Sequence, residues 1–113
     1  MNWFKRSQQE SESGLEDLEG NLVPLNDDGT ITLYHMTDPE SAQKIRETGN
    51  FTSKENTGEA YFSTHPNGYA SGYGNEVVTV KAPPSITQLN DAFRNGEVHV
   101  TIKPDHFNQI QIV

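Results

Sequence analysis

The sequence lacks cysteine altogether, and it also lacks any long run of apolar residues. Without cysteine there is no disulfide bond, no thiolate nucleophile and no cysteine-based zinc site, and the redox compartment stays open. The chain passes from Met-Asn-Trp-Phe-Lys-Arg directly into Ser, Gln and Glu, which is typical of neither a secretory signal nor a membrane span. We therefore expect a soluble protein without a membrane partner, either cytoplasmic or exported by a route that reads no signal peptide.

Basic side chains are scarce as well. The 113 residues include 16 acidic and 8 basic side chains, which gives a net charge of -8. Such a charge does not favour a non-specific grip on a phosphate backbone, so nucleic-acid binding is not expected. Histidine, aspartate and glutamate must carry any acid-base or metal chemistry. Because His65, His99 and His106 lack the spacing of a known ligand motif, we expect no metal.

The length supports one small domain, and the amino-terminal quarter differs from the rest. Residues 1–28 hold seven acidic and two basic side chains among few apolar ones. Such a segment cannot bury enough apolar surface to offset the entropy lost on ordering. We predict an acidic, disordered tail or linker over residues 1–28 and a folded domain over residues 29–113. The spacing of Leu15, Leu18 and Leu22 allows one short helical turn in the tail.

Alternating apolar and polar side chains, bounded by turn residues, predict the strands. We expect five of them, over residues 30–35, 60–62, 76–82, 97–102 and 107–113. Pro83 and Pro84 end the third strand, because proline cannot donate to a ladder of hydrogen bonds. Residues 86–93 have no clear period and are predicted to form a loop or a short helix.

One helix is predicted over residues 39–48. Asp38 is a suitable N-cap, Pro39 fits the first helical position, and Gly49 fits a left-handed stop. With about five strands, one good helix and no alternation of strands with helices, the fold class is α+β. The expected architecture is a small mixed, mostly antiparallel sheet with one main helix.

The strand over residues 97–102 divides its side chains between two faces. Val98, Val100 and Ile102 share one face, which we assign to the core; Glu97, His99 and Thr101 share the other, which should meet solvent or a cleft. Glu97 follows the turn Asn95-Gly96, at the strand mouth. A carboxylate in this position can project towards a ligand, although a solvated surface glutamate fits the same pattern.

The stretch from Glu59 to Gly74 carries the densest set of informative residues. Tyr61, Tyr69 and Tyr73 lie there among short serine and glycine residues. Flat apolar rings, small hydrogen-bonding groups and room for close backbone approach would suit a slot for a planar ring with polar edges. An aromatic core patch with a flexible turn is the alternative interpretation. His35, which ends the apolar stripe of Ile31 and Leu33, likewise has a structural interpretation.

Three short motifs occur in a suggestive order. They are Leu-Tyr-His-Met-Thr, then Ala-Tyr-Phe-Ser-Thr with Ala-Ser-Gly-Tyr-Gly, and then Asn-Gly-Glu-Val-His-Val. Together they resemble the ADP-ribosyltransferase superfamily, in its His-Tyr-Glu branch of diphtheria-like toxins, poly-ADP-ribose polymerases and bacterial polymorphic-toxin domains. The resemblance covers roughly residues 30 to 113 and implies a split-sheet catalytic domain. The matching positions are His35 with Thr37, Tyr61 with Ser63, Tyr73, and Glu97.

This resemblance implies that NAD+ is the substrate and that no metal is needed. His35 would bind a ribose hydroxyl, and Met36, where the family often has glycine, would contact the nicotinamide amide through its backbone. Tyr61 and Tyr73 would sandwich the nicotinamide ring. Ser71 or Ser63 would lie near its carboxamide, and Thr37 belongs to the same set. Glu97 would stabilise the positive charge on the ribose as nicotinamide leaves.

The acceptor of the ADP-ribose is open. Members that modify arginine usually carry a second glutamate two positions before the catalytic one, and Asn95 stands there. Acceptors other than arginine therefore remain: a macromolecule, a small molecule, or water, as in an NAD+ glycohydrolase. A catalytically silent module that binds NAD+ or a protein is an alternative, and so is a metal-free ribonuclease that uses Glu97 with His99 or His35. By analogy, an immunity or regulatory protein is a candidate partner.

Overall fold

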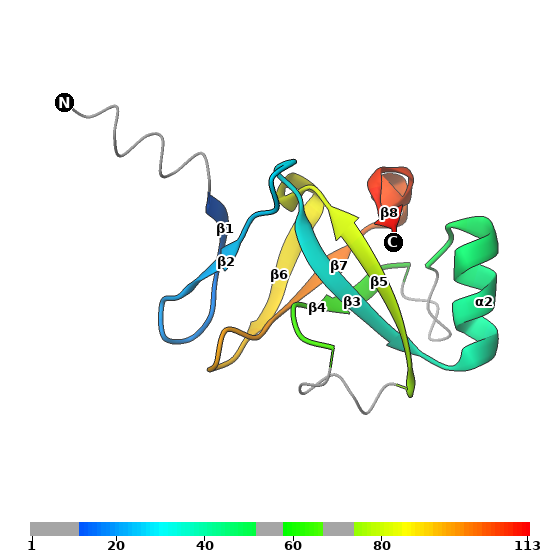
Figure 1. The fold of residues 1–113 in the computed structure, drawn as a ribbon, viewed down its shortest axis with the longest axis horizontal. Coiled ribbons are helices and arrows are strands. Elements are labelled where there is room, and N and C mark those ends of the chain that lie inside the picture. Colours follow the sequence, from blue (N-terminus) through cyan, green and yellow to red (C-terminus); the bar gives the residue numbers. More distant parts are fainter. Residues whose placement is uncertain (1–11, 52–57, 67–73) are drawn as a thin grey trace.

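Six strands form one antiparallel sheet in the computed structural model, which describes residues 12–51, 58–66 and 74–113. The sheet has the order β6-β7-β4-β3-β5-β8 (Figure 1). Its strands are β3 (Ile31–Thr37), β4 (Ala60–Ser63), β5 (Glu76–Ala82), β6 (Thr87–Ala92), β7 (Val98–Ile102) and β8 (Gln111–Ile112). Each pairing in this sheet is antiparallel. The predicted α+β class, mostly antiparallel with one main helix, is confirmed.

The central strands form where the alternating pattern predicts them. Ile31 and Leu33 of β3 lie opposite Ala82 and Val80 of β5, and all four side chains are fully buried. This burial fixes the register, because a slip by one residue would turn the apolar set to the other face. The predicted strand over residues 76–82 has the observed bounds.

The sheet is unevenly paired around β3. β3 and β5 are in register along all seven residues of β3. In the described residues, β3 and β4 are in register at one pair, Tyr34 opposite Ser63. In the described residues, the end of β3, from His35 to Thr37, is therefore in register with β5 but not with β4. This divergence opens a gap in the backbone ladder beside His35.

The predicted helix is α2 (Pro39–Thr48), with the expected caps. The carboxylate of Asp38 accepts a hydrogen bond from the amide of Ser41 at 2.7 Å, and Gly49 has a φ of 74°. Ala42 and Ile45 are buried, and Arg46 donates to the carbonyl of Val77 in β5 at 3.1 Å. The helix therefore packs beside β5. No helix in the described part of the chain is long and apolar enough to cross a membrane.

Two predictions for the carboxyl-terminal half are wrong. Residues 86–93, expected to be a loop or a short helix, instead form mainly the edge strand β6, which directly follows a 3-10 helix, η2 (Pro84–Ile86). The strand expected over residues 107–113 is short, because another 3-10 helix, η3 (Pro104–Gln109), occupies its first part before β8. In β6, backbone pairing with β7 outweighs the weak pattern, and Leu89 remains 59% exposed.

The amino-terminal segment is ordered from residue 12, so the prediction of a disordered tail is wrong for residues 12–28. β1 (Glu12–Glu16) and β2 (Leu22–Pro24) form a separate two-stranded hairpin, which lies beside the β6–β7 turn (Figure 1). Leu15 and Val23 join the hydrophobic core, at 9% and 6% exposure, whereas Leu18 and Leu22 are exposed. The predicted helical turn is therefore also wrong. Residues 1–11 lie outside the described residues.

Gly74 lies where two strand ends come very close, which gives a test of the packing. A Cβ atom built on Gly74 would collide with the carbonyl group of Thr37. We expect Gly74→Ala to lower the free energy of unfolding by about 1–3 kcal/mol, because backbone must move to relieve the contact. Chemical denaturation measures the change.

The exposed neighbour Asn75 provides the control for that test. Asn75→Ala should change the stability by no more than about 0.5 kcal/mol. Equal stability of the Gly74→Ala variant and the wild type would show that the fold does not depend on the close approach of Gly74 to Thr37.

Candidate functional site

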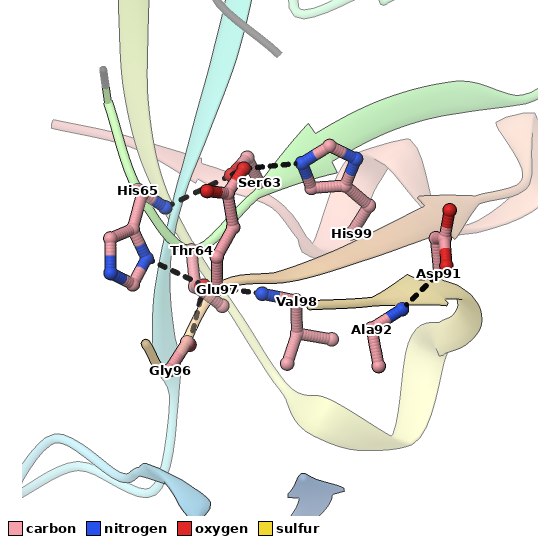
Figure 2. A network of polar contacts seen from close by, with 9 residues as sticks. All are labelled: Ser63, Thr64, His65, Asp91, Ala92, Gly96, Glu97, Val98 and His99. Atoms are coloured by element: carbon pink, nitrogen blue, oxygen red, sulfur yellow. Dashed lines mark hydrogen bonds and ion pairs between the residues drawn. The ribbon is translucent and has the colours of Figure 1, made fainter. Parts of the chain in front are cut away.

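Three polar side chains meet inside the sheet, and we call Ser63, Glu97 and His99 the Glu97 cluster (Figure 2). Nε2 of His99 donates to Oε2 of Glu97 at 2.7 Å, and the hydroxyl of Ser63 lies 3.5 Å from the same oxygen. Their exposed fractions are 1% for Ser63, 4% for Glu97 and 9% for His99. A buried carboxylate is tolerated only where specific donors compensate it, as His99 and Ser63 do here.

Strand pairing explains why these residues meet. Ser63, the last residue of β4, lies opposite His99 in β7. Glu97 comes two positions before His99, so the alternation of a strand puts both on one face. The cluster thus joins the Tyr61 motif to the Glu97 motif, although 34 residues separate Ser63 from Glu97.

The side chains of Glu97, His99 and Thr101 are buried, so the prediction that they meet solvent is wrong, whereas Tyr61 on the same face of the sheet is exposed. All five residues of β7 are buried. β7 is flanked by β4 and β6, and the ring of Phe93 packs against that of His99 with 4.5 Å between centroids. Glu97 itself is buried rather than projecting from an open strand mouth.

The backbone on both sides of Glu97 is fixed. Asn95 and Gly96 have φ values of 70° and 83°, the left-handed conformation that an Asn-Gly pair adopts most readily in a tight hairpin turn. Thr64 holds the other side, where its hydroxyl accepts from the amide of Val98 at 2.9 Å and lies 3.2 Å from the carbonyl oxygen of Gly96. These contacts leave Glu97 little freedom to move along the strand.

His35 is tied to the Tyr61 strand through the backbone. Its Nδ1 lies 2.8 Å from the carbonyl oxygen of Tyr61, and because a carbonyl only accepts, Nδ1 carries the proton. In the neutral ring Nε2 is then an acceptor, which suits a hydroxyl group. Burial lowers the pKa of His35, and the hydrogen bond to Tyr61 opposes this only in part. The ring also contacts Phe51 and Phe62, with centroids 5.6 Å and 5.3 Å away.

The side chains of His35 and Tyr61 point to opposite faces. His35 packs against Phe62, whereas the neighbouring Tyr61 alternates to the face of the Glu97 cluster and is 39% exposed. The structure therefore brings Tyr61, Ser63 and Glu97 to one face and joins His35 to them through the Tyr61 carbonyl. Met36 is buried at 6% exposure.

The remaining predicted site residues have different outcomes. Thr37 ends β3 opposite Glu76. Ser71 and Tyr73 lie outside the described residues. The sequence interpretation gave His99 a role only in the ribonuclease alternative and did not find its contact with Glu97. The shared strand face of Glu97 and His99 was the available signal for that contact.

The neutral state of His35 gives a pH test. Its folded pKa lies below the unfolded value of 6.5, so between the two values the unfolded chain binds the proton and the folded chain does not. The stability that depends on neutral His35 is complete above about pH 6.5 and is lost as the pH falls through the folded pKa. We expect urea denaturation to show this loss.

The His35→Asn variant is the control, because its side-chain amide keeps a donor near the position of Nδ1 but does not titrate. Its stability should depend less on pH than that of the wild type between about pH 4 and 7. Identical pH profiles for the two proteins would show that His35 does not carry the effect.

In the described residues, no group of three or more His, Asp and Glu side chains could hold a metal ion. Comparison of the chain with protein-family models, curated proteins and solved structures finds no match. The functional argument therefore depends on the residues of the site and their arrangement.

Proposed function

We propose that this protein is an NAD+-dependent ADP-ribosyltransferase that cleaves the bond between nicotinamide and ribose. The observation that carries the proposal is the meeting of the Tyr61 and Glu97 motifs, where Ser63 at the end of β4 contacts Glu97, the residue directly before β7. His35 of β3 adds the third motif through its hydrogen bond to the Tyr61 carbonyl. Three motifs that are far apart in sequence thus occupy three adjacent strands, β7, β4 and β3.

The chemistry needs few groups. When the bond between the ribose carbon and the nicotinamide nitrogen breaks, its electron pair goes to nicotinamide, which leaves neutral, and positive charge develops on the ribose. A preorganised carboxylate next to that charge lowers the barrier. We assign this role to Glu97, which Ser63 and His99 hold in place. The acceptor then attacks the ribose carbon and loses its proton.

The other proposed contacts follow from the surroundings. Tyr61 lies on the face of the Glu97 cluster and is accessible for stacking on the nicotinamide ring. The divergence of β3 from β4 supports the proposal of a split sheet, because β3 stays in register with β5 as far as Thr37, whereas in the described residues it is in register with β4 at Tyr34 alone. His35 enters the proposal through its hydrogen bond to the Tyr61 carbonyl, which positions the Tyr61 strand, because its own ring lies on the face of the sheet opposite to Glu97. Thr37, Ser63, Ser71 and Tyr73 complete the proposed NAD+-binding set.

We further propose that the acceptor is macromolecular, as expected of a toxin or effector, and that an immunity or regulatory protein binds the domain. One observation favours a second candidate, a catalytically silent module that binds NAD+ or a protein. Glu97 is only 4% exposed and is paired with His99. A carboxylate used in this way could serve stability alone.

Nicotinamide release from NAD+ tests the proposal. The purified protein is incubated with NAD+, with and without a cell lysate as a source of acceptors, and released nicotinamide is quantified. Release that requires lysate indicates a transferase, whereas equal release without lysate indicates a glycohydrolase. No release by folded protein under either condition would reject the enzymatic proposal in favour of the silent module. Parallel incubation with RNA tests the ribonuclease alternative.

A further inference from the structure

The amino-terminal hairpin reaches the turn that carries Glu97. Its turn residue Asp17 is only 6% exposed. Oδ2 of Asp17 accepts from the amide of Gly96 at 2.7 Å, across 79 positions of sequence. Gly96 directly precedes Glu97, so a carboxylate from the other end of the chain holds the residue next to the proposed catalytic one.

A second contact joins the same two turns. The amide of Leu18 donates to the carbonyl of Phe93 at 2.7 Å, and the amide of Phe93 donates to the carbonyl of Glu97 at 2.9 Å. The ring of Phe93 also packs on His99, which binds the Glu97 carboxylate. The hairpin therefore contacts the turn between β6 and β7 at two points, Phe93 and Gly96.

Asp17 is itself held firmly. Its Oδ1 accepts from the amides of Glu19 and Asn21 at 2.9 and 2.8 Å, and Oδ2 accepts from the side-chain amide of Asn21 at 3.1 Å. Burial raises the pKa of the Asp17 carboxyl, but its hydrogen bonds to Asn21, Gly96 and Glu19 together hold the pKa below its usual value. The carboxylate is therefore held by its own turn, through Glu19 and Asn21, as well as by Gly96.

We propose that Asp17 is a positioning residue, which fixes the Asn95-Gly96 turn and through it the side chain of Glu97. The catalytic consequence depends on the proposed function of Glu97. Asp17 does not touch the reacting atoms; it restricts where the carboxylate can lie. A misplacement of about 1 Å at such a group can lower the rate by about 100-fold.

The test uses the full chain with Asp17→Ala, Asp17→Asn and the control Glu19→Ala. Glu19 is an exposed acid in the same turn, so its replacement removes the same charge without touching Gly96. We expect Asp17→Ala to raise the hydrogen-exchange rate of the Gly96 amide at least about tenfold, as the loss of a charge-assisted hydrogen bond implies. Asp17→Asn, which keeps one acceptor oxygen, should fall between Asp17→Ala and the wild type. Glu19→Ala should match the wild type.

The same variants are then assayed for nicotinamide release. Asp17→Ala should lower kcat by about 10- to 100-fold with little change in the KM for NAD+. An unchanged exchange rate of the Gly96 amide in both Asp17 variants would show that Asp17 does not fix the turn. Faster exchange with an unchanged kcat would show that fixing the turn does not position Glu97 for the reaction. Should Asp17→Ala fail to fold, Asp17→Asn decides both points. Absence of nicotinamide release by the wild type rejects the proposed function of Glu97, whereas the exchange rate of the Gly96 amide still decides whether Asp17 fixes the turn.

Discussion

Replacing Glu97 with glutamine is expected to lower nicotinamide release by about 100- to 1000-fold at saturating NAD+. The reason is electrostatic, because the neutral amide cannot stabilise the positive charge that develops on the ribose. The charge is more effective in a buried site than in water, and Glu97 is only 4% exposed. The measurement compares kcat for the Glu97→Gln variant and the wild type.

Glutamine has nearly the same shape, and its side-chain oxygen can still accept from Nε2 of His99, so the fold should persist. Thermal unfolding of both proteins checks this. Glu47→Gln, an exposed change of the same chemical kind in α2, is the matched control and should leave release unchanged. Release by the Glu97→Gln variant within about threefold of the wild type would remove the carboxylate from the mechanism.

The sequence predicts best those elements whose signals are local. The alternation in β5 and the caps of α2 lie within a few positions of one another, so Asp38, Pro39 and Gly49 define the helix without knowledge of the rest of the fold. The face shared by Ile31, Leu33 and His35 is predicted for the same reason and is observed in the pairing of β3 with β5.

The amino-terminal hairpin could not be predicted in this way. The composition of residues 1–28 is dominated by acidic side chains, so it does not reveal that Leu15 and Val23 are buried against the domain. The contact of Asp17 with Gly96 spans 79 positions. A contact between residues so far apart in the chain produces no local pattern in the sequence. The acidic composition therefore predicted disorder, whereas long-range contacts determine the observed hairpin.

For the site, residue types and strand placement could be predicted, but faces and burial could not. Alternation puts Glu97 and His99 together, yet whether that face is open depends on which strands flank β7 and where Phe93 packs. Likewise, only the register of β3 with β4 reveals that His35 and Tyr61 point to opposite faces. Strand order and register are properties of the whole sheet.

The pairing of Glu97 with His99 predicts a large loss of stability when His99 alone is replaced. His99→Leu removes the donor 2.7 Å from a buried carboxylate, and the side chains are only 5% and 11% exposed for Glu97 and His99. Breaking a buried ion pair by removing one partner costs about 3–5 kcal/mol. We therefore expect the free energy of unfolding to fall by about that amount in urea denaturation.

A second substitution separates the charge from simple loss of packing. Adding Glu97→Met to His99→Leu removes the buried carboxylate that has lost its His99 donor, so the double variant should be more stable than His99→Leu alone. Packing loss alone predicts the opposite, because the double variant would then lose contacts at both positions. A double variant that is no more stable than His99→Leu would therefore show that His99 does not compensate the charge of Glu97. Recovery of stability in the double variant would show that the Glu97 carboxylate requires His99 in the folded state, while Glu97→Gln, which keeps His99, tests the role of that carboxylate in the proposed reaction.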